Sequence, residues 1–339
     1  MSETKKIDIC YASSNEFAIH TGISLLSLLD NNVGNIGDVY ILDYGILDDN
    51  RERLASICNQ YNVSCNFVPS KDILVEIGQK TGIKNFRDSY ATYSRAFIDK
   101  LLPESVDRVL YIDSDTAANG SIAELCDYDM EGKVIVACAC SGFYGNRKDK
   151  KDRNPDLDTL TGNKLYIQCG VVMYSLKNWR KENCHEMIMA TAPKFESLRF
   201  ADQTLINNSI PEKFFGIFSK KYNMTSHTHC KKYSIKRMTA GGWYTKEEAS
   251  DALKHAVIVH YAGGAIQRPW FTDCGSRYKD WYLKYKALSP WCDVPLINRA
   301  ERDNIKGFRA KLKDRLILMS MKTDVYLLSR IYSKISARL

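Results

Sequence analysis

The chain of 339 residues contains no long hydrophobic run. No stretch approaches the ~18 consecutive apolar residues of a membrane-spanning helix, so none is predicted. No basic segment followed by an apolar run opens the chain, which predicts that it carries no signal peptide. With 45% apolar and 26% charged residues, the composition is typical of a globular protein with a sizeable core. We therefore expect a cytoplasmic protein.

Paired cysteine motifs are also missing, although the chain has 11 cysteines. The absence of Cys-x-x-Cys removes the usual zinc and redox patterns. Cys10, Cys138, Cys140 and Cys169 fall in apolar, strand-like runs and Cys58 in a helical stripe, where a free thiol acts as a small buried hydrophobe. His227-Thr-His229-Cys230 is a weak candidate for a metal site, because a solvated loop explains it equally well. We predict that the cysteines are structural.

Positive charge is concentrated at one end of the chain. The net charge is +8, and residues 299–339 hold eleven Lys or Arg against four Asp or Glu. Apolar residues step by three or four through this tail, which predicts basic helices. The predicted organisation is a catalytic domain at 1–294 and a helical basic tail at 295–339. Two interpretations stay open: docking on an anionic membrane, at the inner face of the plasma membrane, or a helical cap with a solvated basic face.

The order of elements indicates an α/β fold. Short apolar runs at 7–12, 38–43 and 63–68 predict strands, separated by helical patterns through 17–29 and 54–61. Such a succession implies a parallel sheet with crossover helices. Tyr93, Phe97 and Leu101 predict another helix. Further strands are expected at 108–112, 133–140, 169–174 and 256–261, and Arg147–Asn154 reads as a charged loop.

Two carboxylates follow the strand at 108–112 without a break. Ligands of open α/β sheets bind beyond the carboxyl ends of the strands. Asp113 and Asp115 occupy such an end, and residues two apart in an extended segment point the same way. Hard divalent cations favour oxygen ligands and commonly combine carboxylates with substrate phosphates. Asp-x-Asp alone is a weak signal, since a solvated turn gives the same pattern. Its place after a core strand favours a metal site.

His260 ends the last predicted strand. A lone histidine there is more often a satisfied core residue than a ligand. The following Gly263 and Gly264 favour a functional role, because glycine lets backbone N–H groups approach a phosphate. Arg268 lies just beyond, where its planar fork suits phosphate oxygens.

Taken together, these segments resemble the family 8 retaining glycosyltransferases, the group with bacterial lipooligosaccharide α-galactosyltransferases and, more distantly, glycogenin. The similarity spans roughly residues 6–285. Its pieces arrive in the family's order: Asp8–Ala12, Thr92–Arg95, Leu110–Asp115, Cys169–Trp179, Ala201–Asn207, and His260–Gly263 with Arg268–Trp270.

The resemblance implies a GT-A (Rossmann-like) fold with a mostly parallel mixed sheet, a UDP-sugar donor, Mn²⁺ or Mg²⁺, and retention of anomeric configuration. It implies metal ligation by Asp113, Asp115 and His260. The transferred sugar would be surrounded by four residues: Arg95, Gln168, Asp202 and Gln203. Nucleotide and diphosphate contacts would come from Ala12, Ser13, Ser14, Phe17, Ser114, Gly263 and Arg268, with Phe17 as a stacking face.

Several positions depart from the family pattern. Ser13 and Ser14 stand where an acidic residue often contacts the base, so uracil contacts would rest more on backbone. Gln168 stands where the family usually has asparagine. The stretch from Gly263 to Arg268 is about two residues longer than usual, and Arg268 replaces a common lysine. These changes leave the metal site intact and blur the identity of the sugar.

The leading hypothesis is transfer of galactose or glucose from its UDP derivative to a lipid-linked or protein-linked glycan, in surface polysaccharide, lipooligosaccharide or glycoprotein synthesis. Asp202 is the nearest candidate for a nucleophile. A front-face mechanism, in which an oxygen of UDP takes the acceptor's proton, is favoured over nucleophilic attack by Asp202. The alternatives are a non-catalytic nucleotide-sugar-binding protein and a metal-dependent sugar nucleotidyltransferase. The latter usually needs a glycine-rich, basic loop after the first strand, which Ser13–Glu16 is not. Nucleic-acid binding is not expected, because the basic charge lies outside the α/β body.

Overall fold

A computed structural model describes residues 5–86, 89–140, 164–195, 198, 200–225 and 230–298, with short pieces between 315 and 331. The predicted loop at 147–154 lies outside the described residues. So do His227 and His229 of the candidate cluster and residues 299–314 of the predicted helical tail.

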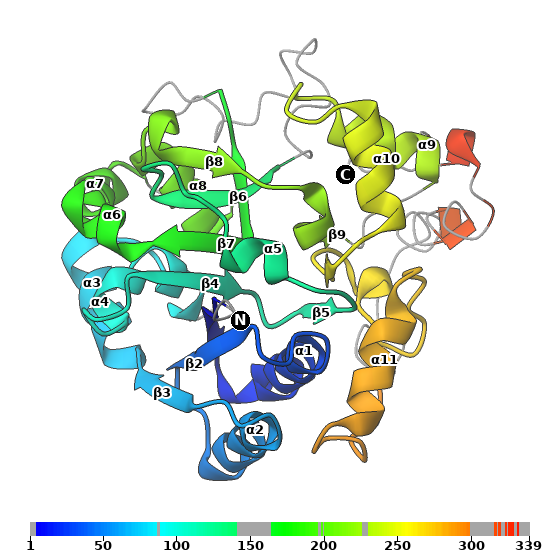
Figure 1. The fold of residues 1–339 in the computed structure, drawn as a ribbon, viewed down its shortest axis with the longest axis horizontal. Helices are drawn as coiled ribbons and strands as arrows, with labels where there is room; N and C mark the ends of the chain where they lie inside the picture. The colour runs from blue at the N-terminus through cyan, green and yellow to red at the C-terminus, as the bar shows by residue number, and fades with distance from the viewer. Residues whose placement is uncertain are drawn as a thin grey trace.

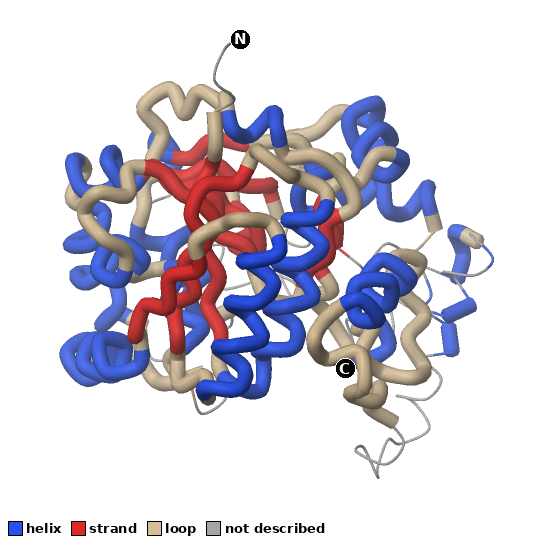
Figure 2. The backbone as a smooth tube through the Cα atoms, turned by 60° about the horizontal axis from the view of Figure 1, so that its bottom comes forward, coloured by secondary structure: helices blue, strands red, loops and turns tan. Residues whose placement is uncertain are grey.

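Within the described residues, seven strands form a central sheet (Figures 1 and 2). All strands run parallel except β7, which is antiparallel to both of its neighbours. The carboxyl ends of the parallel strands and the start of β7 therefore share one edge. The predicted mostly parallel, mixed sheet is confirmed. In spatial order the strands are β3 (Cys65–Pro69), β2 (Ile36–Asp43), β1 (Ile7–Ser13), β4 (Arg108–Ile112), β7 (Ile167–Ser175), β6 (Ile135–Ala139) and β8 (Phe215–Ile217).

Helices cover both faces of this sheet, because its strands are apolar on both sides. In β1, Ile9 and Tyr11 join one buried cluster and Cys10 joins the other. The cluster on the first face contains residues of α1 (Ala18–Asp30), α2 (Asp48–Gln60), α5 (Ala123–Cys126), α9 (Lys231–Met238), α10 (Lys246–Lys254) and α11 (Lys279–Leu288). The cluster on the second face contains residues of α3 (Lys71–Thr81), α4 (Ile98–Leu101), α6 (Leu176–Lys181), α7 (Cys184–Thr191) and α8 (Ala201–Ser209).

A second, small sheet lies beside the first in Figure 1 and consists of β5 (Thr116–Ala118), β10 (Ile258–His260) and β9 (Met224–Thr225). Strand β10 runs antiparallel to β5, with His260 opposite Thr116. Since β5 begins directly after Asp115, this pairing carries His260 to the carboxylates that follow β4.

One predicted element differs in detail. The helix expected through Tyr93 and Leu101 is divided into a 3₁₀ segment, η2 (Ala91–Arg95), and the short α4. Phe97 leaves the helical conformation between them. Tertiary contacts of Arg95, described below, outweigh the local periodicity here.

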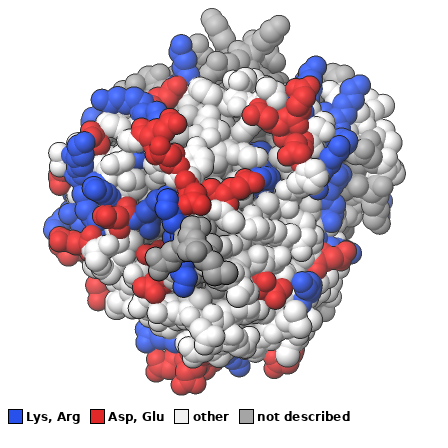
Figure 3. All heavy atoms as spheres, viewed as in Figure 1, with Lys and Arg blue, Asp and Glu red and all other residues white. Residues whose placement is uncertain are grey.

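The drawn face of the surface carries both signs of charge (Figure 3). Asp and Glu gather across its upper middle, and Lys and Arg lie mainly toward its margins. No helix in the described parts of the chain is long and apolar enough to cross a bilayer.

Candidate active site

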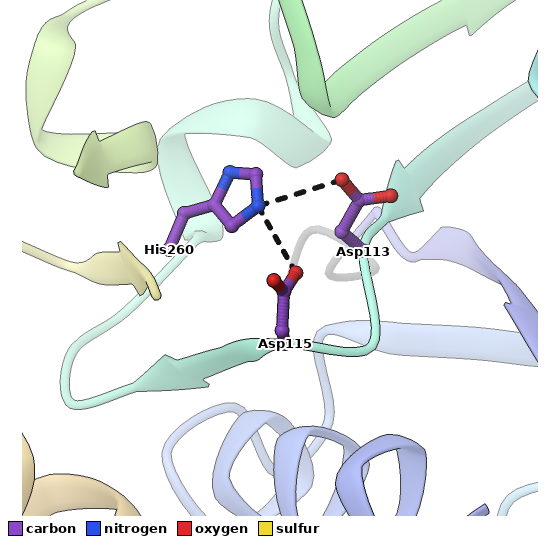
Figure 4. A group of neighbouring side chains, drawn as sticks. All are labelled: Asp113, Asp115 and His260. Atoms are coloured by element: carbon purple, nitrogen blue, oxygen red, sulfur yellow. Dashed lines mark ion pairs between the residues drawn. The ribbon is translucent and has the colours of Figure 1, made fainter. Parts of the chain in front are cut away.

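Asp113, Asp115 and His260 converge at the carboxyl edge of β4 (Figure 4). His260 Nε2 lies 3.0 Å from Asp115 Oδ1 and 3.5 Å from Asp113 Oδ2. One potential ligand atom from each residue falls within 4.8 Å of the other two. The side chains are 20%, 17% and 8% exposed, so the cluster is sheltered but open to a ligand. Sequence reasoning predicted these three residues, and the fold brings them together.

Buried hydroxyl groups hold the turn that carries the two aspartates. Thr116 Oγ1 donates to the Asp113 carbonyl (2.9 Å), and Ser114 Oγ donates to the Ala12 carbonyl (3.0 Å). Thr21 Oγ1, on α1, lies 2.8 Å from both Ser114 Oγ and Ser13 Oγ. These bonds turn Ser114 toward the protein interior, so the flanking carboxylates face the same side.

The backbone of β7 passes very close to this cluster at Gly170. Its carbonyl accepts a hydrogen bond from the Asp113 N–H at 2.8 Å. A Cβ atom built on Gly170 would lie 2.3 Å from His260 Nδ1 and 3.2 Å from Asp113 Oδ2. Only glycine fits this approach. Gly170 lies within the motif Cys169–Trp179 but was not predicted as a site residue. A glycine inside an apolar strand is the sequence signal that could have identified it.

Arg95 connects Asp113 to Asp202. Its Nη1 lies 2.9 Å from Asp113 Oδ1 and donates to the Cys169 carbonyl at 2.6 Å. Its Nη2 and Nε face the two oxygens of Asp202 at 2.8 and 2.5 Å. Asp202, only 1% exposed, also accepts from Thr92 Oγ1 at 3.1 Å. Asp202 thus has both oxygens held inside the protein.

The two predicted glutamines border the same edge of the sheet. Gln203 Oε1 accepts from the Cys169 N–H at 3.1 Å, so this side chain fixes the start of β7. Gln168 Oε1 accepts from Lys220 Nζ at 3.1 Å. Lys220 is a buried lysine that sequence reasoning did not identify, and no local pattern distinguishes it.

Burial and neighbouring charges shift the pKa values of the three cluster residues in different directions. Burial raises the pKa of Asp113 to about 6, although Arg95 and His260 oppose that rise. Burial also disfavours ionised Asp115, yet His260 and Arg268 hold its pKa at about 2. For His260, burial lowers the pKa but the two aspartates outweigh it and raise the pKa above its usual range. An ionised Asp115 paired with His260 is the stable arrangement without a cation.

The residues predicted to line the nucleotide pocket lie at the end of β1 and the start of α1. Phe17 is 44% exposed, so its ring is open for stacking. Ser13 is buried, and its hydroxyl bonds to Thr21 and to the Ser14 carbonyl. Ser14 Oγ donates to Glu16 at 2.8 Å. Neither serine hydroxyl is open as a free donor, which leaves backbone atoms from Ala12 to Ser14 for a base.

Gly263 and Arg268 belong to the segment that follows His260. Gly263 has φ 139°, in the region that favours glycine. Arg268 lies over the Trp270 ring at 5.5 Å and is close enough to Asp115 to lower its pKa. His20, which the sequence analysis did not predict as a site residue, stacks on Trp270 with ring centroids 4.2 Å apart. His20 Nδ1 also lies 2.8 Å from the Tyr282 hydroxyl, and burial lowers the pKa of His20 to about 4.

The fold is that of GT-A glycosyltransferases. It superposes on the galactosyltransferase LgtC, solved in complex with donor and acceptor sugar analogues, with a TM-score of 0.68 at 18% identity, covering 88% of this chain and 100% of LgtC. It also matches apo WbbM, a bifunctional glycosyltransferase, with a TM-score of 0.68 at 21% identity, over 86% of this chain and 51% of WbbM.

The sequence profile of glycosyl transferase family 8 matches residues 8–274, and the chain belongs to this family. Two curated relatives are distant but cover most of it. General stress protein A of Bacillus subtilis is 23% identical, over 88% of this chain and 100% of its own length. The lipopolysaccharide 1,3-galactosyltransferase of Salmonella typhimurium is 24% identical, over 88% and 82%. The resemblance seen in the sequence motifs is therefore confirmed.

Proposed function

We propose that the protein is a retaining hexosyltransferase that moves galactose or glucose from a UDP-sugar to a glycan acceptor. The observation that carries this proposal is the convergence of Asp113, Asp115 and His260 at the carboxyl edge of the sheet. The names of relatives such as the lipopolysaccharide 1,3-galactosyltransferase support a lipid-linked glycan as acceptor. The same support favours this function over a nucleotidyltransferase.

The donor atoms of the cluster fit a divalent cation such as Mn²⁺. Two carboxylates supply hard oxygen ligands, and His260 Nε2 supplies one nitrogen, a combination that suits manganese better than calcium. When bound, the cation would neutralise negative charge on the departing diphosphate. Arg268 and the backbone at Gly263 would hold the phosphate oxygens beside it.

The contacts of Asp202 support a front-face transfer. A nucleophile must reach the anomeric carbon with a free oxygen lone pair. Asp202 Oδ1 accepts hydrogen bonds from Arg95 and Thr92. Among the described residues Oδ2 has no hydrogen bond, but it is enclosed 2.5 Å from Arg95 Nε, so neither oxygen is open to a sugar. Arg95 and Asp202 would instead form a rigid wall that positions the sugar. The acceptor hydroxyl would attack from the face that the leaving diphosphate occupies and pass its proton to the diphosphate oxygen.

We expect no covalent sugar on Asp202 during turnover. Intact-protein mass spectrometry of enzyme quenched with excess donor should show only the unmodified mass. A mass increase of one hexose, located to the peptide of α8 and absent from Asp202→Asn, would replace the front-face route with double displacement.

Donor hydrolysis across a panel of UDP-sugars, with and without Mn²⁺, tests the proposed function. We expect release of UDP from UDP-galactose or UDP-glucose, and loss of that release when the cation is removed by chelation. A protein that binds these donors with Mn²⁺ but never cleaves them, even with a range of glycan acceptors, would be a non-catalytic nucleotide-sugar-binding protein.

The affinity for Mn²⁺ should fall as the pH decreases through about 6. Metal ligands must be deprotonated, and the metal-free pKa of Asp113 is about 6 while that of His260 is raised. Protons therefore compete with the cation on the acid side, by about tenfold per pH unit for each protonated ligand. Titrations of Mn²⁺ by electron paramagnetic resonance from pH 5 to 8 would measure this. A constant affinity over that range would contradict these ligands.

For the basic tail we propose docking on an anionic membrane surface. Met319, Val325, Leu327 and Ile331 are exposed apolar residues within it. Other tail residues contact the catalytic domain: Leu318 lies against Gly275, and Tyr326 lies against Lys232 and Tyr233. The Ile297 N–H also donates to the Trp270 carbonyl at 2.8 Å, so a truncation is best placed after residue 298. Equal flotation of full-length and truncated protein with anionic liposomes would favour the helical cap.

A further inference from the structure

Lys220 is buried where a lysine is costly. It is 2% exposed and begins the 3₁₀ segment η8 (Lys220–Asn223). Its Nζ donates to Gln168 Oε1 at 3.1 Å and to the Ala139 carbonyl at 3.3 Å, both neutral acceptors. Within the described parts of the chain, no carboxylate pairs with it. A buried ammonium without an anionic partner disfavours folding, so the presence of Lys220 at this position indicates a role beyond stability.

The contact with Lys220 determines what the Gln168 amide can offer a ligand. An ammonium group only donates hydrogen bonds, so the amide atom facing it must be the acceptor Oε1. The opposite end, Nε2 with its two N–H donors, has no hydrogen-bond partner among the described residues. This unpartnered Nε2 is not fully enclosed by the described protein atoms. Gln168 is thereby oriented as a donor.

Gln168 directly precedes backbone that the site residues hold. It sits at the start of β7, paired with Cys138 of β6. The next residue, Cys169, receives Arg95 on its carbonyl and binds Gln203 through its N–H. Gly170 follows, in contact range of His260. The backbone on one side of Gln168 is thus held by the residues proposed to surround the transferred sugar.

We propose that Lys220 is a positioning residue that fixes Gln168 as a donor-only contact, so the transferred sugar is recognised there through a hydroxyl oxygen that accepts a hydrogen bond. This inference rests on the proposed function. It predicts a distinct response to altered donors: at the hydroxyl facing Gln168, fluorine can replace OH as an acceptor, whereas hydrogen cannot.

The test measures dissociation constants of UDP-hexose analogues with Mn²⁺, each carrying fluorine or hydrogen in place of one hydroxyl. Binding is preferred to turnover because fluorine also slows the chemical step. For the wild type we expect one ring position where the deoxy analogue binds about tenfold more weakly than the fluoro analogue. In Lys220→Met the side-chain amide of Gln168 is free to rotate by half a turn, so this ratio of dissociation constants should fall to below about threefold.

Two controls separate positioning from a merely structural role. Lys221→Met removes the neighbouring lysine, which pairs with Glu124 at 2.8 Å, and should keep the wild-type ratio. Lys220→Met should also retain or raise the melting temperature, because it removes a buried charge without an anionic partner. A structural residue would give the reverse: a lower melting temperature and an unchanged ratio.

Gln168→Glu gives an independent answer if Lys220→Met does not fold. Its carboxylate would pair with Lys220 and offers no donor, so fluoro and deoxy analogues should bind equally weakly. A wild-type ratio retained in either variant would overturn the role of Lys220, as would a wild type that binds UDP-hexoses with no ring position showing the difference. A wild type that binds no UDP-sugar at all would contradict the proposed function instead.

Discussion

Asp115→Asn is expected to lower kcat/KM for the sugar donor by two to three orders of magnitude, about 3–4 kcal/mol of transition-state stabilisation. Asp115 is the ionised member of the cluster, with its pKa held at about 2, and it lies 3.0 Å from His260 Nε2. Asparagine keeps the shape but removes the charge that a divalent cation needs. Donor hydrolysis and Mn²⁺ titration on the same samples would measure both losses.

Asp49→Asn is the matched control for this change. Asp49 is an exposed carboxylate in the first turn of α2, so its replacement should leave activity and Mn²⁺ affinity unchanged. Full activity of Asp115→Asn with unaltered Mn²⁺ dependence would show that the cation does not bind here. Circular dichroism and thermal melting would establish that both variants are folded.

Gly170→Ala should disable the same site without replacing a proposed metal ligand. The added methyl group would meet His260 Nδ1 at 2.3 Å and Asp113 Oδ2 at 3.2 Å, so the imidazole must move away from the aspartates. Mn²⁺ affinity and kcat should each fall by at least about tenfold, since a misplaced group of about 1 Å can cost as much as 100-fold. Overpacking of this kind also destabilises a protein by about 1–3 kcal/mol.

Gly120→Ala provides the comparison, because a Cβ there would meet Val257 at an ordinary 3.5 Å. It should retain metal affinity and activity. If Gly170→Ala bound Mn²⁺ as tightly as the wild type, the close packing of β7 against His260 would not matter for the site.

Much of the fold follows from local patterns in the sequence. Short apolar runs mark β1, β2 and β4, because each strand must fill both faces of a buried sheet. The helix predicted through Tyr93 and Leu101 is wrong in detail. There the ion pairs of Arg95 with Asp113 and Asp202 determine the backbone, and periodicity does not report such pairs.

The candidate site was predictable where chemistry and position coincide in one segment. Asp113 and Asp115 combine two carboxylates with the end of a core strand, and His260 precedes a glycine-rich turn. Lys220 and His20 carry no such signal, and Gly170 carries only that of a glycine inside an apolar strand. Lys220 lies beside another lysine, and His20 lies within a helix that is buried along almost all of its length. Their roles come from contacts with Gln168, Trp270 and His260, which are distant in sequence.

The sequence by itself determined the α/β succession, the family and the three residues of the candidate metal site, because these depend on residue type and on spacing within short segments. The tertiary structure alone decided how the cluster is built: β10 pairs with β5, β7 runs against its neighbours, and Arg95 joins two aspartates. These arrangements depend on which segments, distant in sequence, pack against one another. A local apolar pattern shows that a segment is buried but does not specify the segment it packs against.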